Sequence, residues 1–351
     1  DRQSLNFRHD QDLGQGALLK TLLGYTRIDQ QTGANSALPL QDYLTDPTRN
    51  NFAIAFRRVE ALRASLELEH RLEAGTLTLT PYARRNAMDL LATFNLSSDP
   101  RIDRSLSRSL GALLQWRQLL PGASRTRLIA GLDLDRSPGT RVEDNVLVTR
   151  TGSGASTRYT AYSPGTRIYD YEVLFRSVSP YVHTETSLGG GLRVSAGLRH
   201  DRLDFDQTNH LPAGTVTANV LGATRHYGQL PGQARDFSNL SPKLGATWSL
   251  HPALHLYGSF NHGFRAPSES QLYRAGNDST AAAALNRARL AADLRPIRAR
   301  QAELGARGEI RGWSGHLVAY RLEKRDDLVS QRDLATNVTT SVDRKSTRLN
   351  S

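Results

Sequence analysis

Strict alternation of apolar and polar residues is the strongest pattern in this chain. One stretch has apolar residues at every second position, Leu192, Val194, Ala196 and Leu198. The alternate positions carry polar residues, among them Arg193, Arg199 and Asp201, which we expect on the opposite face. The same period recurs at 62–68, 128–134 and 244–250. Successive side chains of a β-strand point to opposite faces, whereas a helix would scatter these positions around its axis. We therefore expect an all-β protein whose strands have one apolar and one polar face.

The connections between the alternating segments differ in length. Short turns that contain Gly or Pro are expected near 12–14, 73–75, 121–122, 189–190, 251–252 and 311–312. Long polar connections are expected at 30–51, 95–103, 137–167, 207–236 and 266–298, and residues 277–293 have the composition of a short helix. Connections longer than about 15 residues are uncommon in compact soluble domains.

Alternating turn lengths are typical of outer-membrane barrels, which have short periplasmic turns and long extracellular loops. The sequence therefore predicts part of an antiparallel transmembrane β-barrel, with about twelve strands of a larger barrel. Residues 1–344 belong to this partial barrel. The last seven residues, 345–351, break the pattern and are interpreted as a non-native tail.

The formal net charge of +11 would suit a nucleic-acid partner if the basic residues were clustered. They are instead interspersed with acidic ones, as Arg63 and Arg71 are with Glu67 and Glu69, which is typical of a solvated face. We expect no nucleic-acid partner.

No catalytic site, metal site or cofactor is expected. The chain has no cysteine, which excludes disulfides and thiolate metal ligands, and its ten histidines are scattered singly. Hydrolase and metalloprotease motifs do not occur in it. The sequence thus favours a protein that is not an enzyme.

Several short motifs in the last third of the chain resemble a known family. They are SNLSPKLGAT at 238–247, LYGSF at 256–260, GFRAP at 263–267, Leu272-Tyr273 and ELG at 303–305. Their order is similar to the barrel segment of TonB-dependent receptors. The resemblance implies an outer-membrane barrel of roughly 22 strands with a plugged lumen, of which about half is present.

The resemblance also implies a function and its partners. The function is active import of a bulky, scarce nutrient, for which a ferric siderophore is the preferred ligand class. The partners are a siderophore-like ligand, outer-membrane lipid, and the TonB inner-membrane complex, contacted through a plug domain that lies outside these residues. Two alternatives stay open: a passive porin or adhesin barrel, and a soluble β-sandwich binding module.

A ligand pocket would come from the external loops and the upper lumen. Aromatic and Arg side chains in these places can hold an anionic or aromatic chelate. The candidate ligand-binding residues are Tyr159, Tyr162, Tyr169, Tyr171, His226, Tyr227, Arg265, Tyr273 and Arg274.

Overall fold

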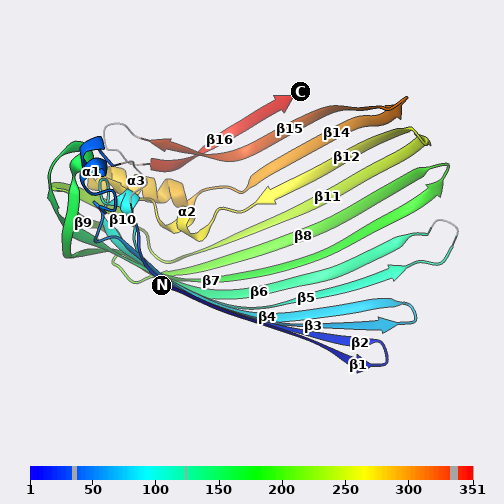
Figure 1. Cartoon of the computed structure of the whole chain (residues 1–351), viewed down its shortest axis with the longest axis horizontal. Helices are drawn as coiled ribbons and strands as arrows, with labels where there is room; N and C mark the ends of the chain where they lie inside the picture. Colours follow the sequence, from blue (N-terminus) through cyan, green and yellow to red (C-terminus); the bar gives the residue numbers. More distant parts are fainter. Residues whose placement is uncertain (34–37, 123–124, 333–338, 351) are drawn as a thin grey trace.

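The computed structural model of the protein describes residues 1–33, 38–122, 125–332 and 339–350. Thirteen strands form one antiparallel sheet, which curves into an open trough (Figure 1). In spatial order the strands are β1 (Arg2–Gly14), β2 (Ala17–Gln31), β3 (Phe56–Leu72), β4 (Gly75–Leu91), β5 (Arg101–Leu119), β6 (Arg127–Thr151), β7 (Arg158–Gly189), β8 (Leu192–Asn209), β11 (Gln233–His251), β12 (Leu254–Arg265), β14 (Ile297–Ile310), β15 (Trp313–Arg332) and β16 (Thr339–Asn350). This architecture confirms the expected antiparallel sheet, in which strands that follow one another in the chain pair.

The remaining elements lie in the long connections. A second sheet contains β9 (Gly214–Val220), β10 (Ala223–Gln229) and β13 (Asn277–Asp278). The helices are α1 (Leu40–Thr45), η1 (Thr93–Asn95), η2 (Gly154–Ser156), α2 (Glu269–Tyr273) and α3 (Ala281–Ala292). Helix α3 confirms the helix expected within 277–293. Figure 1 shows α1, α3, β9 and β10 at one rim of the trough and the short hairpin turns at the other.

Cross-strand pairing assigns each residue to one of two faces, because directly paired residues share a face. We call the face on which α2 packs the inner face. It includes Arg199, whose guanidinium bonds Asp133 at 2.6 Å and Asp201 at 2.7 Å. The outer face carries the apolar positions, and Leu198 is 42% exposed there. The predicted separation of Leu198 from Arg199 and Asp201 is confirmed.

Tyrosines on the inner face lie over glycines of the neighbouring strand. The Tyr82 ring crosses Gly111, and its hydroxyl donates to Asp135 Oδ2 on the next strand at 2.5 Å. Tyr181 crosses Gly131 in the same way and accepts from Gln115. Because a side chain at either glycine would occupy the space of the ring, these glycines allow three strands to be joined across the inner face.

One of the expected long connections is wrong, and two others differ in detail from the structure. The connection expected at 137–167 is mostly strand, since β6 continues to Thr151 and β7 begins at Arg158. The connection at 207–236 contains the β9–β10 hairpin, and β5 already begins at Arg101. These segments are polar because their strands extend past the apolar part of the outer face, while pairing still satisfies their backbone groups.

The end of the chain also departs from the expected division. Residues 345–350 were left out of the barrel, yet in the structure they belong to β16, which pairs with β15 from Arg332 to Arg321. The non-native origin of residues 345–351 stays a prediction, and residue 351 lies outside the described residues.

Candidate functional site

A buried cluster of charged residues lies on the inner face near the rim that carries the long connections. Its centre is Glu143 of β6, which is fully buried. The Glu143 carboxylate pairs with Arg141 at 2.8 Å, with Arg101 at 3.0 Å, and with Arg274. Arg274 follows α2, so this ion pair attaches a long connection to the sheet wall.

Two further carboxylates complete this cluster. Asp103 pairs with Arg141, and Asp99 pairs with Arg101. Three guanidinium groups thus face three carboxylates, and the formal charges balance. Burying charges in this way is tolerated only where each has close partners, so the cluster holds its geometry tightly.

The electrostatic environment differs between two acids of this cluster. Burial opposes ionisation of Glu143, but the combined attraction of Arg274, Arg101 and Arg141 lowers its pKa below the ordinary value. For Asp103, burial and the nearby Glu143 charge raise the pKa despite the pair with Arg141. Glu143 is therefore the firmly ionised centre of the cluster.

Four tyrosines surround the charged cluster. Tyr227 donates to Asp99 Oδ1 at 2.5 Å, and Tyr171 donates to Glu269 Oε1 at 2.6 Å. Tyr169 meets the Tyr227 ring edge-on at 5.9 Å, and Tyr171 meets Tyr273 at 6.1 Å. Burial raises the pKa of all four phenols, that of Tyr273 to about 12, so the phenols are neutral. Tyr169, Tyr171 and Tyr227 use their hydroxyls as hydrogen-bond donors.

A cavity of about 620 Å³ opens on the inner face next to the charged cluster. Arg141 and Glu269 line one part of it, and the rings of Phe175 and Phe205, 4.9 Å apart, line another. Three serines, Ser105, Ser107 and Ser137, contribute hydroxyls to the lining, and several apolar residues line the rest, among them Val59, Met88 and Val173. The size and the combination of aromatic, hydroxyl and charged groups are those of a small-molecule site.

The structure brings five of the nine candidate residues together. Tyr169, Tyr171, Tyr227, Tyr273 and Arg274 surround the charged cluster and the neighbouring aromatic core. Their role in ligand binding stays a prediction.

The other four candidates lie elsewhere. Tyr159 is buried in a separate core, where its ring stacks on Phe52 at 5.3 Å. Tyr162 and Arg265 are exposed at strand ends. His226 lies on β10, and its Nδ1 is 3.2 Å from the Thr217 hydroxyl.

Sequence reasoning missed Arg101, Arg141 and Glu143. The missed signal is parity, because Arg141 and Glu143 continue the odd-numbered polar positions Asp133 and Asp135 of the same strand. The error follows from treating 137–167 as a loop, where parity has no meaning.

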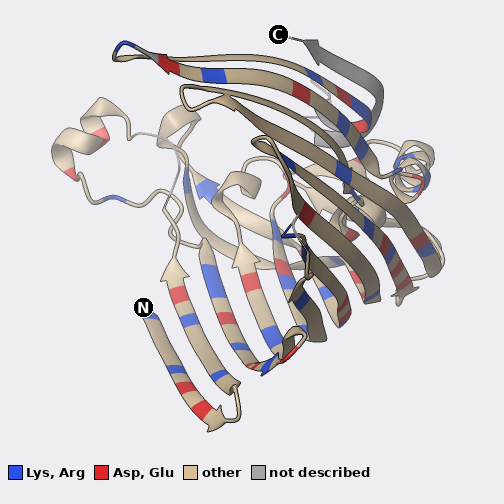
Figure 2. Cartoon of the chain, turned by 90° about the vertical axis from the view of Figure 1, so that its right-hand side faces the viewer, with Lys and Arg blue, Asp and Glu red and all other residues tan. Residues whose placement is uncertain are grey.

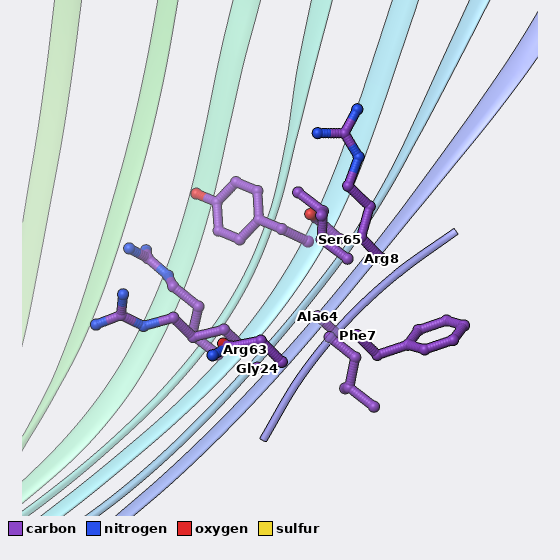
Figure 3. A pocket seen from close by; sticks show the side chains of 11 residues that line it. Phe7, Arg8, Gly24, Arg63, Ala64 and Ser65 are labelled. Carbon is purple, nitrogen blue, oxygen red and sulfur yellow. The ribbon is translucent and has the colours of Figure 1, made fainter. Parts of the chain in front are cut away.

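A second hollow, of about 530 Å³, lies where β1 to β4 curve near one edge of the main sheet. Figure 3 shows that its lining comes from both faces, since Phe7 projects to one side of the ribbon and Arg8 and Arg63 to the other. None of its lining residues belongs to the charged cluster or to the nine candidate ligand-binding residues, so we do not assign this hollow to the candidate site.

The described residues contain neither a metal-binding cluster nor a membrane-spanning helix. No group of three or more His, Asp or Glu side chains in this part of the chain could hold a metal ion. No helix in the same residues is long and apolar enough to cross a membrane.

Three solved structures with a similar fold are described as transporters or import receptors. The sheet is similar to the ferric citrate transporter FecA in its unliganded form, with a TM-score of 0.64 and 14% identity over 93% of this chain and 43% of that one. It is similar to the copper transporter OprC, with a TM-score of 0.61 and 12% identity over 99% and 48% of the two chains. For the ferric-catecholate import receptor Fiu from E. coli K12 the TM-score is 0.63, with 12% identity over 99% and 54%.

These likenesses establish the fold alone, and the chain spans about half the length of the structures it matches. No curated protein matches the sequence. The fold and the apolar outer face define the class: an antiparallel outer-membrane barrel.

Residues 4–349 match the family described as TonB dependent receptor-like, beta-barrel, so the chain belongs to that family. Members of the family are outer-membrane barrels of Gram-negative bacteria, which places this chain in the outer membrane. Family and fold are those of transport receptors and not of enzymes.

Proposed function

We propose that this chain is part of a receptor that binds a bulky ferric chelate of the siderophore type and imports it with energy from the TonB system. The observation that carries the proposal is the inner-face cavity of about 620 Å³, lined by Arg141, two phenylalanine rings in tilted contact, and serine hydroxyls. Aromatic rings suit the organic part of a chelate, and a guanidinium suits its negative charge. Iron held inside a chelator needs no protein ligand.

The charged cluster supports this proposal through Arg141. The Arg141 guanidinium is oriented by Glu143 and Asp103, so its position is fixed before any ligand arrives. A fixed donor loses less conformational entropy on binding than a mobile one. Helix α2, held through Tyr171 and Arg274, would form the lid of the same site.

Neighbouring structures offer concrete ligands to test. Their names mention ferric citrate, ferric catecholates and copper. The experiment uses the full-length receptor that contains this chain, with ferric citrate, a ferric tris-catecholate and copper(II) as probes of tryptophan fluorescence. We expect a ferric chelate to bind and free copper(II) not to bind.

A variant that fills the cavity makes this test specific. Ser107→Trp places an indole in the cavity and is expected to weaken chelate binding more than tenfold. Ser65→Trp is the control, because Ser65 lies on the same face of the sheet but does not line the cavity. Binding of copper(II) alone, or equal chelate affinity in both variants, would contradict the proposal.

A passive porin barrel is the second candidate function. The energy dependence of chelate uptake distinguishes it from an active receptor. In cells that lack their own receptor for the bound chelate, uptake by the full-length receptor should stop when the proton gradient is collapsed. Uptake that persists without the gradient would favour a passive porin.

A further inference from the structure

Arginines on the outer face lie near the end of its apolar part on four consecutive strands, each one outward position before its last apolar residue: Ala87, Leu106, Pro138 and Leu174. On β6 the outward positions Leu128, Ala130, Leu132 and Leu134 are followed by Arg136. The same switch occurs at Arg85 on β4, Arg108 on β5 and Arg176 on β7. Figure 2 shows basic bands on neighbouring strands of the sheet.

These side chains are brought together by the register of the strands. Arg85 is paired directly with Arg108, and Arg136 is paired directly with Arg176. Directly opposed residues have Cβ atoms about 5 Å apart, and like charges in such pairs are destabilising. Two such pairs on adjacent strands therefore need a compensating negative charge.

The protein supplies little of this compensation. Arg85 pairs with Glu60 at 2.8 Å, and Asp204, which is opposite Arg176 in the register, makes its ion pair with Arg202 at 3.7 Å. Arg108, Arg136 and Arg176 are exposed and make no ion pair with an acidic side chain of the described residues. We call these three residues the arginine patch.

Exposed apolar residues lie beside the arginine patch on the outer face. Leu110, Leu134 and Val178 are the next outward residues on the side of the short turns, and they are 64%, 39% and 45% exposed. In an outer-membrane barrel these exposed apolar residues contact the hydrocarbon of the bilayer. The patch thus lies one outward residue inside the end of the apolar part, close enough to the headgroup region for the long arginine side chains to reach it.

We propose that the arginine patch binds phosphate groups of membrane lipids in the leaflet on the side of the long connections. A guanidinium offers paired donors that match two phosphate oxygens, and the low hydration of this cation favours such contacts at an interface. Phosphate charge would relieve the repulsion between Arg136 and Arg176. The patch therefore fixes the depth of the barrel in the membrane.

The test measures lipid binding to the full-length receptor in a neutral detergent by native mass spectrometry. Phosphatidylglycerol, whose headgroup is anionic, is compared with zwitterionic phosphatidylcholine. The variant Arg136→Gln/Arg176→Gln is expected to lose roughly 25-fold in affinity for phosphatidylglycerol, since each such side chain near an anionic surface contributes about fivefold. Its affinity for phosphatidylcholine should fall much less, because the choline cation offsets the phosphate charge of that lipid.

The control variant is Arg150→Gln/Arg158→Gln. Arg150 and Arg158 are exposed on the same two strands, and Arg150 lies about 45 Å along β6 from Arg136 at about 3.3 Å per residue. The proposal would be overturned if this control lost as much affinity for phosphatidylglycerol as Arg136→Gln/Arg176→Gln, or if the latter variant kept the wild-type affinity. It would also be overturned if the wild type bound both lipids equally well. Inorganic phosphate at about 10 mM would saturate a site that binds free phosphate with millimolar affinity. Complete displacement of phosphatidylglycerol at this concentration would therefore also overturn the proposal.

Discussion

Tyr227 and Asp99 are 128 positions apart in the chain, yet the Tyr227 hydroxyl donates to the Asp99 carboxylate at 2.5 Å. Tyr227 lies on β10, within one long connection, and Asp99 lies in the connection between β4 and β5. Asp99 in turn pairs with Arg101 of the charged cluster. This bond therefore links two connections to the inner wall of the barrel.

Removing that bond should loosen the β9–β10 hairpin. Tyr227→Phe leaves the ring in place but removes the only hydroxyl among the described residues from which Asp99 accepts a hydrogen bond. The loss of a buried, charge-assisted hydrogen bond costs about 1–3 kcal/mol. We expect faster amide hydrogen exchange in Gly214–Val220 of the full-length receptor, with the barrel strands unchanged.

Tyr162→Phe is the matched control for this prediction. The same hydroxyl is removed from an exposed tyrosine, so the exchange rates of the hairpin should stay at the wild-type values. If Tyr227→Phe leaves them unchanged as well, the bond to Asp99 does not order the hairpin.

Glycine under a tyrosine ring should be intolerant of substitution. A Cβ at Gly111 would lie 2.3 Å from the Tyr82 ring and 2.5 Å from the Leu134 carbonyl oxygen, and the backbone atom cannot move freely. Overpacking of this kind costs about 1–3 kcal/mol. Gly111→Ala should lower the temperature at which the folded band is lost in heat-modifiable gel migration.

Gly263→Ala provides the comparison, since its nearest neighbour would be Ala299 Cβ at an ordinary 3.7 Å. Its unfolding temperature should match the wild type. A Gly111→Ala protein that melts with the wild type would mean that the Tyr82 ring can rotate out of the way.

The charge of Glu143 should stabilise the rim over most of the pH range. Its pKa is lowered by three arginines, so its contribution is fully present above the ordinary value of 4.5 and is lost as the pH falls through the lowered pKa. Glu143→Gln removes the carboxylate partner of Arg274 and one of the two carboxylate partners of Arg101 and of Arg141, which costs about 3–5 kcal/mol. Thermal melts of wild type and variant should differ equally at pH 8 and pH 5.

The difference between these melts should shrink only below pH 4.5. A difference that already disappears between pH 8 and pH 5 would show that the pKa of Glu143 is raised by burial and not lowered. Asp103→Asn should change stability less than Glu143→Gln, because the pKa of Asp103 is raised and its ionised form is the less favoured one.

Parity predicted the two faces of the sheet because the side-chain period of a strand is fixed by backbone geometry. Leu198 and Arg199 were assigned to opposite faces from the sequence alone, and the structure agrees. The charged cluster was not predictable in this way. Glu143 and Arg274 come together through the placement of α2 against β6, and no local pattern specifies a contact across 131 positions.

The two faces can be tested with one substitution at adjacent positions. Leu114 and Leu113 are 39% and 42% exposed, so accessibility in the described structure does not distinguish them. Leu114 shares the outer face with Leu132, whereas Leu113 is paired with Asp133 on the inner face. Because hydrocarbon cannot hydrate a guanidinium, Leu114→Arg should destabilise the full-length receptor by about 2–4 kcal/mol near the bilayer midplane.

Leu113→Arg should cost less, because the inner face is polar and Asp133 offers a nearby carboxylate. The measurement is urea unfolding of the receptor in phosphatidylcholine vesicles, followed by gel migration of the folded band. Equal destabilisation by both variants would show that the two faces meet similar surroundings, and a larger cost for Leu113→Arg would reverse the assignment. The expected ranking follows from strand parity together with the outer-membrane location of the family.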